Sequence, residues 1–147
     1  MSKFVIKKII KPFVRTLNIE GDKSLSIRWA LIASQAIGKS YAKNLLKSDD
    51  VLNTLNCLKK LGTKIKKKKD RYEIYGLGLN GYRFKHNIVL DAGNSGTLSR
   101  LILGLLIHTK KRIRLKGDKS LSKRDFLRVT KPLENFGARF KTNSGKL

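Results

Sequence analysis

The chain has 147 residues, of which 40% are hydrophobic and two are proline, so it is long enough to bury a core and is not wholly disordered. Its 34 Lys and Arg against 10 Asp and Glu give a net charge of +24, which favours nucleic acid or phosphorylated metabolites as partners unless the excess is only solvated lysine. A single cysteine excludes an internal disulfide, and no apolar run is long enough to span a bilayer, so we expect a reduced, cytoplasmic protein.

The first residues predict strands and a helix. Short β-branched runs at residues 4–10 and 16–20 are typical of strands. Residues 24–37 are rich in helix formers and precede Gly38, which we interpret as the helix stop. A short strand is then expected at residues 40–46.

The clearest helix is predicted at residues 48–62, with Ser48 or Asp49 as its cap and Gly62 as its stop. Cys57 is expected beside its apolar face. The leucines expected on this face are Leu52, Leu55, Leu58 and Leu61. Residues 63–76 then predict a β-hairpin that turns around positions 69 and 70.

The second half of the chain repeats this order. The expected elements are a strand at 87–93, a helix at 95–108, a strand at 112–117, a helix at 124–137 and the start of a hairpin at 138–142. We therefore expect an α/β (α+β) protein built from repeated β-α-β-α-β-β units. Residues 1–80 would form the first unit with its N-terminal strand, and residues 81–147 a second, truncated unit.

The hexapeptide GDKSLS occurs twice, at Gly21–Ser26 and Gly117–Ser122, and each copy is followed by an arginine, Arg28 or Arg124. The first copy opens the first helix of unit one, whereas the second precedes the second helix of unit two. Duplication of the unit therefore does not account for the repeat. A shared chemical task does, and the glycine, hydroxyls and cations of each copy suit the binding of anions.

The first copy predicts an anion site at a helix N-terminus. If the helix begins near Ser24, its free backbone N–H groups and the positive end of its dipole face the preceding turn. Lys23 and Ser24 would then lie at this site, with Arg28 one turn along on the same face. The alternative is an ordinary helix start in which Ser24 is the cap and the two cations are solvated.

The segment LDAGNSGTLSR predicts a similar turn in the second half. Its glycines permit close approach of the backbone to a ligand, while Asn94 and Thr97 supply short polar side chains. Arg100 follows Gly96 by one helical turn. The alternative is a glycine-rich cap with Arg100 in a structural ion pair.

Three further patterns are interpreted as structural. The segment AIGKS at Ala36–Ser40 lacks the first glycine of a nucleotide P-loop, and its helix precedes its strand. Asp49 and Asp50 are interpreted as charges at a helix N-terminus. The basic segment Lys64–Arg71 is interpreted as a solvated hairpin tip, because no aromatic-rich RNA-binding sheet motif or basic recognition helix accompanies it.

Four motifs in order resemble the front part of the 3-phosphoshikimate 1-carboxyvinyltransferase (EPSP synthase) family, namely GDKSLSIR, NLLKSDDVLNTLNCLKKLG, LDAGNSGTLSR and GDKSLSKR. The resemblance extends from about Thr16 to Phe140. It implies a two-domain cytoplasmic enzyme of the shikimate route to aromatic amino acids. Such an enzyme moves the enolpyruvyl group of phosphoenolpyruvate to the 5-hydroxyl of shikimate 3-phosphate, releases phosphate, and needs no metal or organic cofactor.

The resemblance also implies the substrate site. Lys23 matches a catalytic lysine that touches both substrates, and Ser24 and Arg28 match residues that bind shikimate 3-phosphate. The residues implied at the phosphoenolpyruvate site are Asn94, Gly96, Thr97, Arg100 and Arg124. Such a cluster of cations suits the reaction, because two phosphates and two carboxylates must meet in one place.

Some features depart from the family pattern. Asp125 follows Arg124 where the family usually has proline, which places an acid beside an expected anion contact. The acid and base carboxylates of the family belong to a later part that this chain does not contain. We therefore expect a portion of a longer protein or a degraded gene product that is inactive alone.

The resemblance implies two small-molecule substrates, no membrane or nucleic-acid partner, and a monomer when the protein is complete. Two alternatives remain open. The sister transferase that acts on UDP-N-acetylglucosamine shares the fold, although its first turn typically carries Lys-Asn in place of the sequence at Asp22–Ser24. A basic nucleic-acid-binding module is the alternative from a different class.

Overall fold

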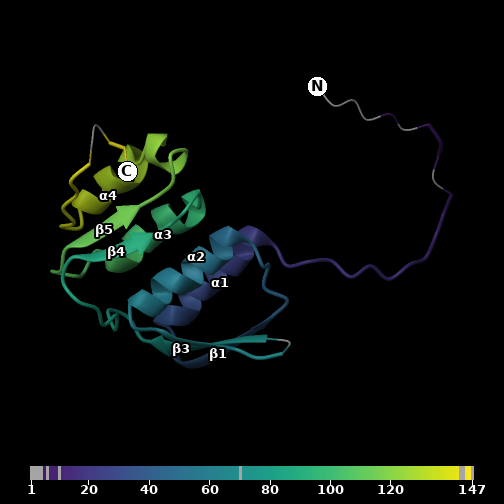
Figure 1. Cartoon of the computed structure of the whole chain (residues 1–147), viewed down its shortest axis with the longest axis horizontal. Coiled ribbons are helices and arrows are strands. Elements are labelled where there is room, and N and C mark those ends of the chain that lie inside the picture. The colour runs from purple at the N-terminus through teal and green to yellow at the C-terminus, as the bar shows by residue number, and fades with distance from the viewer. Residues whose placement is uncertain (1–4, 6, 10, 70, 143–144, 147) are drawn as a thin grey trace.

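The computed structural model describes residues 5, 7–9, 11–69, 71–142 and 145–146. Figure 1 shows helices α1 and α2 side by side, with the β1-β3 sheet on one side of them and α3, β4, β5 and α4 on the other. The elements in chain order are α1 Lys23–Gln35, β1 Ile37–Lys43, α2 Asp49–Lys60, β2 Lys64–Lys67, β3 Arg71–Leu77, β4 Ile88–Asp91, α3 Gly96–Leu106, β5 Ile113–Lys116, the 3-10 turn η1 Leu121–Lys123, and α4 Leu127–Glu134.

The first half contains an antiparallel sheet in the order β1-β3-β2. The predicted hairpin is confirmed, since β2 and β3 pair with Lys64 opposite Tyr75 and Ile65 opposite Ile74. Ile74 is fully buried on the face that meets the helices. The interpretation of Gly38 as a helix stop is wrong, because α1 ends at Gln35 and Gly38 lies inside β1 with a φ of +93°.

The second half contains two parallel strands, β4 and β5, joined through α3. Because the strands are parallel, the segments that follow them leave from the same edge of the sheet. The backbone N–H of Asp118 accordingly donates to the carbonyl of Gly93 over 2.8 Å. This pairing brings the LDAGNSGTLSR turn against the second copy of GDKSLS.

One hydrophobic core joins both halves and includes the fully buried Ile27, Leu58 and Leu98. The predicted leucine face of α2 is only partly correct, since Leu52 is 42% exposed while the other three leucines are buried. Residues three apart in a helix advance by about 300°, so four such positions spread over half of its circumference. Cys57 is buried as expected.

Several predicted strands are absent. Residues 16–20 and 138–142 form no strand, and of the predicted strand at 4–10 the residues 4, 6 and 10 lie outside the described residues while the others form none. A strand needs a neighbour to satisfy its backbone N–H and C=O groups, and the sheets described here provide none for these segments. Residues 11–18 instead run as an extended chain away from the body of the molecule (Figure 1), which the chain reaches where the side-chain NH2 of Asn44 donates to the carbonyl of Ile19.

Helix α4 is shorter than predicted and contains Pro132, as expected. The division into two units at residues 80 and 81 remains a prediction, because the two halves share one core. Within the described ranges, no helix combines the length and apolar character needed to cross a membrane.

Candidate anion-binding site

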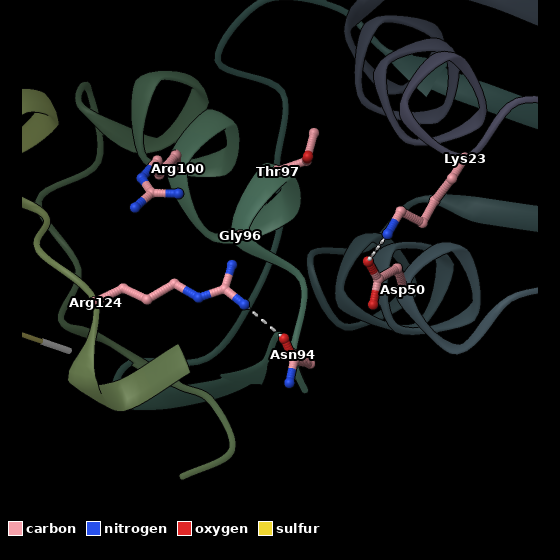
Figure 2. Close-up of a pocket in the computed structure, with 7 residues that line it drawn as sticks. All are labelled: Lys23, Asp50, Asn94, Gly96, Thr97, Arg100 and Arg124. Carbon is pink, nitrogen blue, oxygen red and sulfur yellow. Dashed lines mark hydrogen bonds and ion pairs between the residues drawn. The ribbon is translucent and has the colours of Figure 1, made fainter. Parts of the chain in front are cut away.

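A pocket of about 370 Å³ opens where the first turns of α1, α2 and α3 meet the segment after η1. Its lining residues are Lys23, Asp50, Asn94, Gly96, Thr97, Arg100 and Arg124 (Figure 2). Six of the eight residues predicted for the site are therefore brought together. The other two, Ser24 and Arg28, lie on α1 outside the lining.

The first copy of GDKSLS forms the start of α1, and Asp22 is its cap. The Asp22 carboxylate accepts from the N–H of Leu25 over 2.7 Å, and its carbonyl accepts from the N–H of Ser26 over 3.0 Å. The alternative with Ser24 as the cap is therefore wrong. A carboxylate therefore occupies this helix end, and Lys23, the first residue of α1, lines the pocket.

The second copy forms the same capped turn. The Asp118 carboxylate accepts from the N–H of Leu121 over 2.7 Å, and its carbonyl accepts from the N–H of Ser122 over 2.9 Å. Here the helix ends after one 3-10 turn, and Arg124 adopts an extended backbone with φ −77° and ψ 146°. Both copies therefore share a local structure, but only the second sends its following arginine into the pocket.

Asn94 links Arg124 to Asp118. Its side-chain NH2 donates to the second carboxylate oxygen of Asp118 over 2.6 Å, and its carbonyl oxygen accepts from Nη2 of Arg124 over 2.8 Å. The pKa of Asp118 is lowered from its usual range, chiefly by the N–H of Leu121 and further by Asn94 and by the charge of Arg124. An ionised Asp118 fixes the orientation of the Asn94 amide, and this orientation places an oxygen against the guanidinium.

Arg100 is held by the residues that follow Arg124. Its Nη2 donates to the backbone carbonyl of Asp125 over 3.1 Å, and its guanidinium lies 5.2 Å from the ring centroid of the buried Phe126. Its Nε is buried without a hydrogen-bond partner among the described residues. The Asp125 carboxylate accepts from the N–H of Leu127 over 2.8 Å at the start of α4, so this departure from the family pattern has a local structural role.

Gly96 marks the point where the two guanidinium groups converge. A Cβ atom placed on Gly96 would lie 2.7 Å from Nη1 of Arg124 and 3.1 Å from Nη1 of Arg100. Gly96 is the first residue of α3, whose cap Ser95 accepts from the N–H of Leu98. The positive helix end and the two guanidinium groups thus act on the same small volume, an arrangement that favours a phosphate or a carboxylate.

The opposite wall of the pocket carries an ion pair between Lys23 and Asp50 (Figure 2). Nζ of Lys23 lies 3.2 Å from Oδ2 of Asp50, and the Asp50 side chain is 19% exposed. Sequence reasoning missed Asp50, because an acid in the first turn of a helix has a sufficient explanation in the helix dipole. Three cations against one carboxylate leave this lining positively charged.

Comparison with known proteins finds similarity over nearly the whole chain. A family model described as EPSP synthase (3-phosphoshikimate 1-carboxyvinyltransferase) matches residues 7–147. The chain belongs to the EPSP synthase family. The α/β class and the family predicted from the sequence are therefore confirmed.

Individual EPSP synthases show how much of the family this chain covers. The 3-phosphoshikimate 1-carboxyvinyltransferases of Ruthia magnifica subsp. Calyptogena magnifica and Vesicomyosocius okutanii subsp. Calyptogena okutanii are 44% and 43% identical to the whole chain, which covers 33% of each. The structure of EPSP synthase from Acinetobacter baumannii matches with a TM-score of 0.80 and 34% identity, over 89% of this chain and 30% of that one. The chain thus spans about a third of the length of the EPSP synthases that it matches.

Proposed function

We propose that the protein to which this chain corresponds transfers the 1-carboxyvinyl group of phosphoenolpyruvate to the 5-hydroxyl of shikimate 3-phosphate and releases phosphate. This chain would supply the phosphoenolpyruvate end of the site. The observation that carries the proposal is the convergence of the Arg100 and Arg124 guanidinium groups over Gly96, with Lys23 on the facing wall. As an enzyme of small metabolites, the complete protein is proposed to act in the cytoplasm as a monomer.

Phosphoenolpyruvate carries a phosphate and a carboxylate, and the two guanidinium groups offer forked donors that match both. Each is already held in place, Arg124 by the Asn94 carbonyl and Arg100 by the backbone carbonyl of Asp125. Prepositioned cations need little reorganisation as charge moves toward the departing phosphate, so they stabilise the transition state more than mobile ones would.

Lys23 is proposed to contact both substrates. In the structure its ammonium group is paired with Asp50, and this contact holds it at the pocket wall. Ser24 and Arg28, which follow it on α1 outside the pocket, are proposed to bind shikimate 3-phosphate. Thr97 completes the wall at the first turn of α3.

The proposed reaction has two steps. In the addition, the 5-hydroxyl oxygen bonds to C2 of phosphoenolpyruvate, loses its proton to a base, and C3 gains a proton to give a tetrahedral intermediate. In the elimination, C3 loses a proton, the bond between C2 and the phosphate oxygen breaks, the C2=C3 double bond forms again and phosphate leaves. The acid and base carboxylates that the family resemblance implies match no motif of this chain, so we expect this chain to bind phosphoenolpyruvate without turnover.

The proposal is tested by Arg124→Ala in the complete enzyme. The kcat/KM for phosphoenolpyruvate should fall at least a hundredfold, since a charged donor to the transferred group is removed. The control is Arg128→Ala, which removes an exposed arginine of α4 that does not line the pocket. A near-normal kcat/KM for Arg124→Ala would refute the assigned role.

A further inference from the structure

The sheet of the first half has an outer face that points away from α1 and α2. Strand register places its side chains in four rows, because directly opposed residues of antiparallel strands share a face. The row at one end, Ile37–Leu77, is aliphatic. The other three rows are Lys39–Tyr75–Lys64, Tyr41–Glu73–Lys66 and Lys43–Arg71. We call the eight residues of these three rows the outer face.

The outer face is strongly cationic. It carries five lysine and arginine side chains, all on exposed residues. Glu73, the acid in these rows, is 5% exposed and accepts from Nε and Nη2 of Arg71 over 3.2 Å and 3.1 Å. Within these eight residues, the surface that a partner could reach therefore consists of cations and aromatic rings.

Two tyrosine rings lie among these cations. The ring centroid of Tyr75 lies 5.2 Å from Nζ of Lys39 and 5.4 Å from Nζ of Lys64. Tyr41 is 51% exposed, and its ring centroid lies 5.1 Å from the guanidinium carbon of Arg71. The sequence alone shows no aromatic sheet motif beside the basic hairpin, because Tyr41 belongs to β1. Only the pairing of β1 with β3 brings it next to the hairpin.

We propose that the outer face binds single-stranded nucleic acid, with phosphates on the lysines and bases stacked on Tyr41 and Tyr75. Proteins that bind single-stranded nucleic acid without sequence preference stack the bases on aromatic side chains in a positively charged groove or sheet, since every base has a face that can stack. An anionic membrane is the less suitable partner, because the exposed aliphatic side chain in this register, Ile37, lies at one end of the sheet. The proposal departs from the expectation that nucleic acid is not a partner.

The outer face is separate from the anion-binding pocket. Helices α1 and α2 lie between the sheet and the elements β4 and α3 (Figure 1). The pocket uses Lys23, Arg100 and Arg124, none of which belongs to the outer face. Binding of nucleic acid therefore does not depend on the proposed enzymatic function, and phosphoenolpyruvate should not compete with it.

The test measures binding of the chain to a fluorescent oligouridylate of about twelve nucleotides, by anisotropy over a range of salt concentrations. The variant Lys39→Gln/Lys64→Gln/Lys66→Gln should bind more weakly. Its plot of log K against log salt should be less steep by about 2, since each phosphate contact with a single strand contributes about 0.7. The matched control Lys110→Gln/Lys131→Gln/Lys141→Gln removes three exposed charges away from the sheet and should leave the slope nearly unchanged.

The tyrosines are tested separately from the charges. Tyr41→Leu/Tyr75→Leu should weaken binding about tenfold or more with an unchanged salt slope, whereas Tyr41→Phe/Tyr75→Phe, which keeps the rings, should bind like the parent. Circular dichroism and thermal unfolding verify that each variant is folded. If the double Leu variant does not fold, the single variants Tyr41→Leu and Tyr75→Leu replace it, and each should bind more weakly than the parent.

Three results would overturn the proposal. Equal losses in the lysine variant and in its charge-matched control would assign binding to net charge alone. Displacement of the oligonucleotide by phosphoenolpyruvate would place it in the pocket. The third result is a lysine variant that no longer co-sediments with phosphatidylserine vesicles but binds oligouridylate as the parent does. The outer face would then be a membrane-binding surface.

Discussion

Replacing Asp118 by asparagine is expected to weaken phosphoenolpyruvate binding although it removes a negative charge near the pocket. The Asp118 carboxylate has two tasks, since one oxygen accepts from the N–H of Leu121 and the other accepts from the NH2 of Asn94. An asparagine has one acceptor oxygen and cannot do both. Either the capped turn loses its contact, or Asn94 rotates and presents NH2 instead of oxygen to Arg124.

The magnitude follows from the contact that is lost. A hydrogen bond to a charged group stabilises more than one between neutral groups, and a donor left facing a cation adds a further cost. Removing the carboxylate charge acts in the opposite direction, but only weakly, because Asp118 is exposed and water screens its charge. We therefore expect affinity for phosphoenolpyruvate to fall about five- to tenfold.

Isothermal titration calorimetry of this chain with phosphoenolpyruvate at low ionic strength measures the effect. The matched control is Asp22→Asn, because Asp22 holds the same position in the first copy of the hexapeptide and caps its turn in the same way. Among the hydrogen bonds that the structure describes, its side chain makes none to a residue of the pocket lining. Asp22→Asn should leave affinity unchanged or slightly increased. Equal or tighter binding by Asp118→Asn would refute the positioning role and leave only the electrostatic one.

Three further predictions concern the pocket and the core. Gly96→Ala should lower phosphoenolpyruvate affinity about tenfold with little change in the free energy of unfolding, because the new Cβ meets the ends of two flexible arginine side chains and no backbone; calorimetry and urea titration of the same variant test both parts. Asp50→Asn should release Lys23 and strengthen binding of inorganic phosphate, while the free energy of unfolding changes by less than about 1 kcal/mol, because the Lys23 side chain is 51% exposed and solvent screens the pair; weaker phosphate binding would contradict this. Cys57 is buried and burial raises the pKa of its thiol to about 11, so labelling by a thiol reagent at pH 8 should follow global unfolding and should not occur at the rate of an exposed cysteine.

The elements with strong local signals could be predicted from the sequence. Helix α2 begins after Ser48 and ends before Gly62, and the hairpin of β2 and β3 pairs as expected. The predicted strands at 16–20 and 138–142 were wrong because β-branched composition describes a preference that only a partner strand can satisfy. Gly38 was misinterpreted since glycine is compatible with both a helix end and a strand.

The site could be predicted as a set of residues but not as a geometry. Motif spacing marked the cations of the separate turns, and the family resemblance implied that those of the pocket, including Lys23 and Arg124, meet in one site. The link through Asn94 could not be predicted, because it depends on the parallel register of β4 and β5, which brings Asp118 against the Gly93 turn. The outer face depends in the same way on a pairing between strands that are distant in the sequence.

The two copies of GDKSLS start identical turns, yet their arginines end in different surroundings. After the first copy, Ile27 and the residues beyond it continue the helix, so Arg28 stays on the flank of α1. After the second, the chain straightens at once and Arg124 reaches across to another loop. If the hexapeptide and the two residues after it were grafted into another protein, they would form the same helix start. The position of the arginine side chain would depend on whether the residues that follow continue the helix.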